Sequence, residues 1–220
     1  DITIDNLREN FDLFYHPSQM HLLVIGKFDV DPILQVLKEY DQISQLPSIK
    51  MERFPVEKNE VRLNQSCRMG VATPKLAIGI RGNDIIKEEE KFRYKLMLKL
   101  LFSMMFGWTS QRFQSLYEAG KIDNSLTLEV EVEELFHFVI LTMDTKEPVS
   151  LSHQFRSAIK QFDKDPDVNQ EHLDTIKSEM FGDFLQGLNS LEYSATQFEY
   201  FSDGSTSYDL PKILQGISLQ

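Results

Sequence analysis

The chain is poor in cysteine and in basic residues. Cys67 is the only cysteine among 220 residues, so neither an intramolecular disulfide nor a cysteine-based zinc site is expected. A single cysteine favours a reducing compartment, and we therefore expect a cytoplasmic protein. The 23 Lys and Arg residues are outnumbered by 34 Asp and Glu, which gives a net charge of −11. This excess of acid predicts no nucleic-acid partner, because phosphate contacts need clustered Lys and Arg.

Long apolar runs are also missing. The densest one, residues 96–106, is interrupted by Lys99 and Ser103 and falls well short of the roughly 20 residues of a membrane span. It predicts a buried helix, and we expect no membrane partner. Residues 1–11 have no apolar signal core. The chain begins without Met on a helical pattern, from which we expect a fragment of a longer protein.

The histidines do not form a hydrolytic metal motif. They occupy positions 16, 21, 137, 153 and 172. No two are four residues apart, so neither H-E-x-x-H nor H-x-x-E-H occurs. His137 stands between two phenylalanines and is interpreted as a packed strand residue, and His153 and His172 as exposed helix positions.

Nucleophile and phosphate-binding motifs are absent as well. The sequence contains no G-x-S-x-G, no P-loop and no G-x-G-x-x-G. Arg68 follows Cys67 and is able to lower a thiol pKa, but nothing in the pattern supplies a base, so Cys67 is interpreted as a strand residue. We therefore assign no catalytic, cofactor-binding or metal-binding residue to this chain, and no cofactor.

The pattern that is present begins with a helix–strand–helix. Apolar residues at helical spacing predict a helix over residues 4–15. Met20–Phe28 is a continuous apolar run, which predicts a strand buried on both faces. Asp31-Pro32 provides an N-cap and a first-turn proline for the next helix. We assign residues 1–40 to this piece and residues 41–59, with Pro47 and Pro55, to a linker.

Residues 60–220 predict an antiparallel sheet with several helices packed on it, an α+β fold. The expected strands are 60–72, 75–81, 125–132 and 135–143, the last two forming a hairpin around Glu133-Glu134. A long helix is expected over 86–105, and a second one begins at Thr109 or Ser110 and ends at Gly120. Further helices are expected from Pro148, over about 173–188, after Asn189, and around 210–214.

Two stretches resemble the insulinase / pitrilysin / mitochondrial-processing-peptidase family of zinc metallopeptidases, the inverzincins. Within residues 10–31 the run Y-H-P-S-Q-M followed by an apolar strand is similar to the passage that closes the first module of these proteins, with Gln19 in place of the usual Asn. Within residues 76–120, L-A-I-G-I-R-G and then F-G-W-T-S-Q-R-F-Q-S-L-Y-E-A-G resemble a passage of the second module.

The resemblance implies a peptidase part without an active site. In active members this passage supplies an Arg and a Tyr that polarise the substrate carbonyl, and these positions fall on Tyr117 and near Asn124 here. Neither residue matches, so neither role is transferred. The chain then resembles the non-catalytic C-terminal part of a bacterial processing-protease-like protein, with zinc in an upstream module and a peptide as substrate. The expected partners are that zinc-bearing module and a second family member.

The family's two-module architecture gives the domain organisation. Residues 1–40 would close a preceding module, and residues 60–220 would form a second, metallopeptidase-like module that lacks its own closing elements. Residues 1–40 supply a helix–strand–helix, and a helix–strand–helix is the closing element that the second module lacks. We therefore hypothesise that residues 1–40 fill the vacant slot, in the same chain or in a neighbouring copy through a strand swap or homo-oligomer.

Two other functions fit the same residues. A non-enzymatic scaffold or interaction subunit of this fold would also lack the motifs. An unrelated α+β domain that binds a ligand is the third alternative, and a deep apolar pocket with convergent polar groups would favour it.

Overall fold

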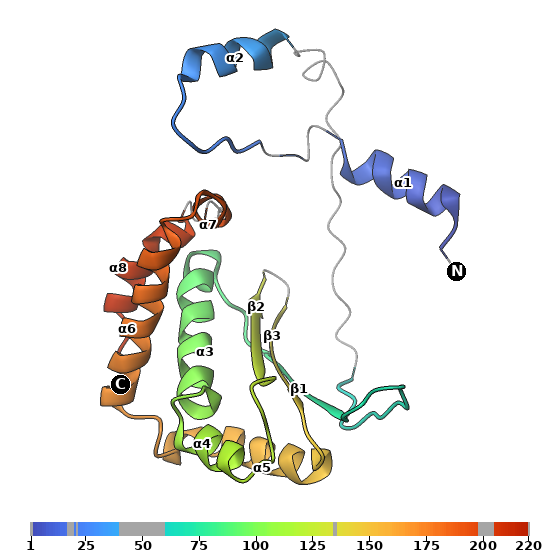
Figure 1. The fold of residues 1–220 in the computed structure, drawn as a ribbon, viewed down its shortest axis with the longest axis vertical. Helices are drawn as coiled ribbons and strands as arrows, with labels where there is room; N and C mark the ends of the chain where they lie inside the picture. Colours follow the sequence, from blue (N-terminus) through green and yellow to red (C-terminus); the bar gives the residue numbers. More distant parts are fainter. Residues whose placement is uncertain are drawn as a thin grey trace. The chain divides into compact units, whose positions relative to one another are not determined.

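The computed structural model describes residues 2–16, 20, 22–39, 60–133, 136–197 and 205–219. The chain divides into two compact units. The smaller unit comprises Asp1–Pro55 and Asn189–Thr196, and the larger one comprises Val56–Leu188 and Gln197–Gln220. The predicted linker, residues 41–59, lies outside the described residues. Figure 1 labels the elements of both units.

The smaller unit contains three helices among its described residues. They are α1 (Ile4–Phe14), α2 (Val30–Glu39) and α7 (Leu191–Thr196). The predicted helix at residues 4–15 is confirmed, and a capping box of Thr3 and Asn6 begins it. The next helix begins at Val30, one residue before the expected cap Asp31. Pro32 therefore lies inside its first turn, where its missing N–H breaks no helical bond.

The predicted strand Met20–Phe28 is not formed. Residues 22–28 belong to no strand, and Leu22, Leu23, Val24 and Phe28 are 41–69% exposed. An apolar run specifies burial, but a strand also needs a second strand to satisfy its backbone, and the described residues of this unit provide only helices. The described sheet of the chain does not include this segment. The idea that residues 1–40 complete that sheet within one chain stays a prediction, and so does a swap with a neighbouring copy.

The larger unit holds the sheet. Its strands are β1 (Lys75–Arg81), β2 (Thr127–Val132) and β3 (His137–Asp144). Its α-helices are α3 (Lys91–Phe106), α4 (Gln111–Glu118), α5 (Pro148–Lys160), α6 (Gln170–Gly187) and α8 (Leu210–Gln215). Short 3-10 turns are η3 (Glu88–Glu90), η4 (Phe162–Lys164) and η5 (Ser207–Asp209). The predicted α+β class is confirmed.

Two expectations for this unit are wrong in detail. Residues 60–72 form no strand and are exposed nearly throughout, because the alternating apolar residues there find no adjacent strand in the described sheet. Cys67 is consequently an exposed residue outside any strand. The long helix begins at Lys91 rather than Ile86, since Glu88–Glu90 form a 3-10 turn. The ion pair between Lys91 and Glu88 joins the two.

The sheet has the order β1-β3-β2 and is antiparallel throughout. The predicted hairpin is confirmed, with Thr127 opposite Thr142 and Val132 opposite His137. Leu128, Val130, Val139 and Leu141 face the helices. The opposite face carries exposed or half-buried residues. They are Lys75, Ala77, Gly79, Arg81, Thr127, Glu129, Glu131, Phe138, Ile140, Thr142 and Asp144.

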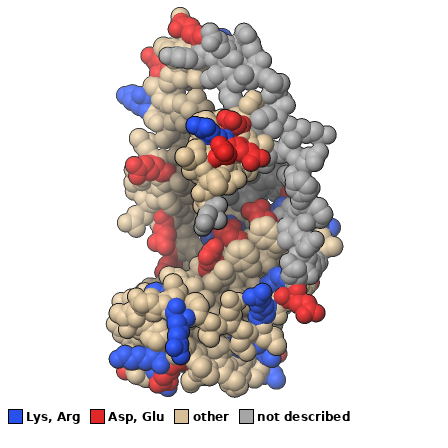
Figure 2. Space-filling view, turned by 90° about the vertical axis from the view of Figure 1, so that its right-hand side faces the viewer, with Lys and Arg blue, Asp and Glu red and all other residues tan. Residues whose placement is uncertain are grey.

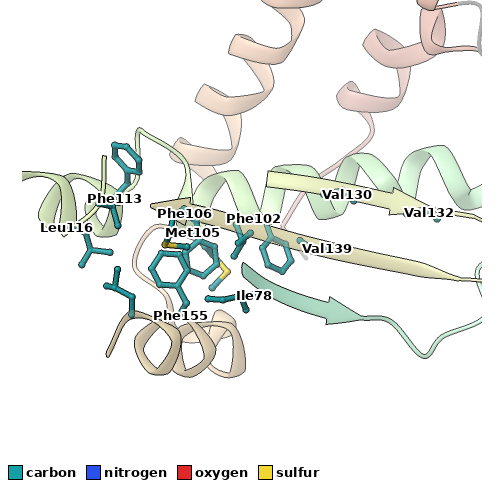
Figure 3. Close-up of a cluster of buried hydrophobic side chains, with 14 residues drawn as sticks. Ile78, Phe102, Met105, Phe106, Phe113, Leu116, Val130, Val132, Val139 and Phe155 are labelled. Carbon is teal, nitrogen blue, oxygen red and sulfur yellow. The ribbon is translucent and has the colours of Figure 1, made fainter. Parts of the chain in front are cut away.

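Two apolar clusters lie on either side of α3. One joins α3, α4 and α5 to the helix-facing side of the sheet, and Figure 3 shows its side chains meeting from these elements. The other joins α3 to α6 and α8 through Leu96, Leu100, Leu173 and Leu214. Because α3 lies between the two clusters, it must be apolar nearly all round, which explains its sequence.

The charged surface has no single sign on the side drawn in Figure 2. Lys and Arg side chains lie scattered among Asp and Glu there. Among the described residues, no helix is long and apolar enough to cross a membrane.

Candidate functional site

The histidines are placed on separate elements. His137 is 5% exposed in β3, which confirms its interpretation as a packed residue, and His153 is exposed on α5 as expected. His172, expected to be exposed, is half-buried. Its Nδ1 lies 2.9 Å from the Asp167 carbonyl oxygen and its Nε2 lies 2.9 Å from Thr109 Oγ1.

A hydrolytic zinc ion does not fit the described residues. Zinc needs three or four His, Cys, Asp or Glu ligands converging on one point. In residues 2–16, 20, 22–39, 60–133, 136–197 and 205–219, no group of three such side chains is arranged to hold a metal ion. No step of zinc chemistry is therefore derived for this chain.

An apolar hollow of the larger unit lies between the C-terminal part of α3 and the beginning of β2. We call it the α3–β2 pocket. It has a volume of about 230 Å³. Its lining is mostly apolar and consists of Phe102, Ser103, Phe106, Gly107, Trp108, Phe113, Asn124, Leu126, Leu128 and Leu141.

The two positions singled out by the resemblance lie at or near this pocket. Asn124 is exposed and lines it. Tyr117 is 46% exposed on α4, and its ring stacks at 5.9 Å on Phe113, which is a wall residue. The sequence pointed to both positions but did not predict the pocket, because the pocket walls come from segments far apart along the chain.

Asn124 lies in the turn that leads into β2. Asp123 Oδ1 accepts a hydrogen bond from the Ser125 backbone N–H at 2.9 Å. Hydrogen bonds from the Ser125 side chain and backbone hold the pKa of Asp123 below its usual value. The Ser125 hydroxyl in turn accepts from the Asp144 N–H at 2.8 Å, which ties the turn to the end of β3.

A polar corner holds the α3–α4 connection that borders the pocket. Ser110, fully buried, caps α4 by accepting from the Phe113 N–H at 3.1 Å, and its hydroxyl donates to the Gly107 carbonyl at 2.8 Å. Asp167 accepts from the Gln111 N–H at 3.0 Å. The indole of Trp108, 62% exposed at the pocket, donates to Glu179 on α6 at 3.0 Å.

A second buried polar contact lies at the far end of β3. The hydroxyl of Tyr94 lies 3.5 Å from His137 Nε2, and the two rings meet edge to face at 5.3 Å. Burial raises the pKa of Tyr94, and the nearby Asp84 raises it further. The pair is a packing contact between α3 and β3.

Comparison with known proteins assigns the family. Residues 1–180 match the family described as the peptidase M16 inactive domain. The chain belongs to the M16 peptidase family. The resemblance to the insulinase and processing-peptidase group is thereby confirmed, and an unrelated α+β ligand-binding domain is ruled out.

The relatives that the chain matches are longer than the chain itself. Over 224 residues the chain is 30% identical to the uncharacterized zinc protease YmfH of Bacillus subtilis, covering 100% of this chain and 52% of that protein. An M16-like protein from Alicyclobacillus acidocaldarius has the same fold at 20% identity, with a TM-score of 0.72 over 99% of this chain and 53% of that one. A protease from Helicobacter pylori matches at 15% identity with a TM-score of 0.72, covering 99% of this chain and 54% of that one. The chain thus spans about half the length of the relatives it matches.

Proposed function

We propose that this M16 inactive domain is the non-catalytic part of a zinc-dependent bacterial processing peptidase. It helps to enclose a peptide substrate and contacts the zinc-bearing module of the full protein. The described residues hold no metal-binding group, so the zinc belongs to that other module.

The observation that carries the proposal is an apolar pocket beside an open strand edge. In the described sheet β2 has a neighbour only on its β3 side, and the α3–β2 pocket is lined by Leu126 and Leu128 at the start of that strand. An extended peptide that pairs with a free strand edge directs alternate side chains to one face of the sheet. One such side chain would enter the pocket while the backbone bonds to β2.

The smaller unit suits contact with another module. Neither α1 nor α2 buries a single residue. Phe11, Leu22 and Leu34 are 45–69% exposed, which is costly for a unit left alone in water. We propose that residues 1–40 close a preceding module, that 41–59 form the linker, and that 60–220 form the second module.

The test uses the full-length protein and a Leu128→Gln variant. A polar amide in the apolar pocket should raise the KM for a cleaved peptide about tenfold, because Gln leaves its amide unsatisfied there. The matched control is Glu171→Gln on α6, which does not line the pocket and should leave KM unchanged. Zinc removal should abolish cleavage by the full-length protein. Residues 1–220 alone should cleave nothing, and cleavage by them would overturn the proposal.

The alternative is a non-enzymatic scaffold. Two residues favour it: Tyr117 stands at the position where active members have Arg, and Asn124 stands near the position where they have Tyr. It would show as a full-length protein that binds its partner module and peptide but cleaves no peptide at any zinc concentration.

We also propose that the protein is cytoplasmic. The single Cys67, exposed and without a disulfide partner, suits a reducing compartment. Cell fractionation of the native bacterium tests this placement.

A further inference from the structure

Arg112 makes three contacts from the first turn of α4. One guanidinium nitrogen lies 2.6 Å from Asp165 Oδ2. The other donates to the Met105 carbonyl at 2.9 Å, one of the last carbonyls of α3. The guanidinium carbon lies 5.2 Å from the centre of the Phe106 ring, a cation–π contact. Only a planar fork with several donors can make all three contacts at once.

Phe106 connects this cluster to the α3–β2 pocket. It is 2% exposed and is one of the pocket's walls. Its ring stacks on Phe155 of α5 at 4.7 Å, and both rings lie in the cluster drawn in Figure 3. Its ring also lies 6.0 Å from the Phe102 ring. Arg112 is the cationic contact of this wall, beside the aromatic contacts with Phe102 and Phe155.

Asp165 in turn fixes Arg112. Its side chain is 1% exposed, and a carboxylate so buried needs a cationic partner to offset its loss of hydration. Its other oxygen accepts from the Asp167 N–H at 3.0 Å, and this bond anchors the carboxylate to the α5–α6 connection. The guanidinium is thus held from one side while it supports Phe106 on the other.

We infer that Arg112 is a positioning residue that sets the width of the α3–β2 pocket through Phe106. The pocket so shaped takes a large apolar or aromatic peptide side chain in preference to a small one. This inference rests on the proposed function, because it names the side-chain class that the same pocket selects.

The test compares two peptides that differ only in having Phe or Ala at one position. The wild-type full-length protein should bind the Phe peptide more tightly, and equal binding of both peptides would overturn the inference. Dissociation constants are measured by fluorescence anisotropy for the wild type and for Arg112→Lys. Lys can still pair with Asp165 but cannot hold Met105 and Phe106 as well. The ratio of the dissociation constants for the Ala and Phe peptides should therefore fall about tenfold in this variant. Asp165→Asn should lower the same ratio.

The control removes a buried cation from the same unit. Lys91→Met breaks the ion pair with Glu88 but changes no pocket residue, so the preference should stay as in the wild type even if the melting temperature falls. An unchanged preference in Arg112→Lys would overturn the inference, as would an equal loss in Lys91→Met, which would mark a general stability effect. If the wild type binds neither peptide, the proposed function itself fails, irrespective of Arg112.

Discussion

Gly82, directly after β1, shows how one residue can be fixed by packing alone. Its backbone N–H donates to the His137 carbonyl at 2.9 Å. A Cβ placed on Gly82 would overlap the His137 imidazole. The buried histidine thus excludes every side chain at position 82. Gly79, in the middle of β1, has open space around its Cβ direction.

Gly82→Ala should therefore destabilise the larger unit by about 1–3 kcal/mol, because the ring or the strand end must move to admit the methyl group. Gly79→Ala is the matched control within β1 itself and should change stability by less than about 0.5 kcal/mol. Urea unfolding of both variants measures the difference. Equal losses would mean that His137 does not press on Gly82.

Helix α4 illustrates how an element is fixed by its ends. It has only eight residues, too few to be stable by helix propensity. Phe113 and Leu116 bury its apolar face, and Ser110 caps it with a hydroxyl that both accepts and donates. Without that hydroxyl, the Gly107 carbonyl would lose one of its two hydrogen bonds and keep the one from the Ser110 backbone N–H at 2.9 Å.

Ser110→Ala should lower the free energy of unfolding by about 1–2 kcal/mol, since the substitution removes a fully buried cap and leaves the Phe113 N–H without its acceptor. Asn169, the cap of α6, is a fair comparison because its side chain is exposed. Asn169→Ala should cost only about 1 kcal/mol. The comparison is made by thermal and urea unfolding. A smaller loss for Ser110→Ala than for Asn169→Ala would contradict this account of the corner.

At the scale of the whole molecule, the two units differ in how much of their apolar surface they bury. The larger unit buries two apolar clusters around α3. The described helices α1 and α2 bury nothing, although their apolar residues recur at helical spacing. From these exposed faces we predict that this unit is stabilised by contacts outside itself.

Hydrogen exchange tests whether contacts outside the smaller unit stabilise it. The amides of α2, residues 30–39, should exchange fast in residues 1–220 alone and slowly in the full-length protein, where a preceding module would cover them. Leu34→Asp should restore fast exchange in the full-length protein, while Gln35→Asp, on the polar side of the same helix, should not. Equal protection in the isolated chain and the full-length protein would rule out this use of residues 1–40.

The sequence by itself determined the local elements of this protein. Alternation in residues 125–132 predicted β2, and helical spacing with Ser110 and Pro148 predicted α4 and α5, since these signals are contained in a few adjacent residues. The absence of paired histidines likewise follows from spacing alone. The tertiary structure decided whatever depends on distant neighbours. Met20–Phe28 has the composition of a buried strand, yet a strand forms only beside another strand. The α3–β2 pocket and the contacts of Arg112 form where α3, α4, the start of β2 and the α5–α6 connection come together. A pattern of adjacent residues cannot predict that these distant segments are neighbours.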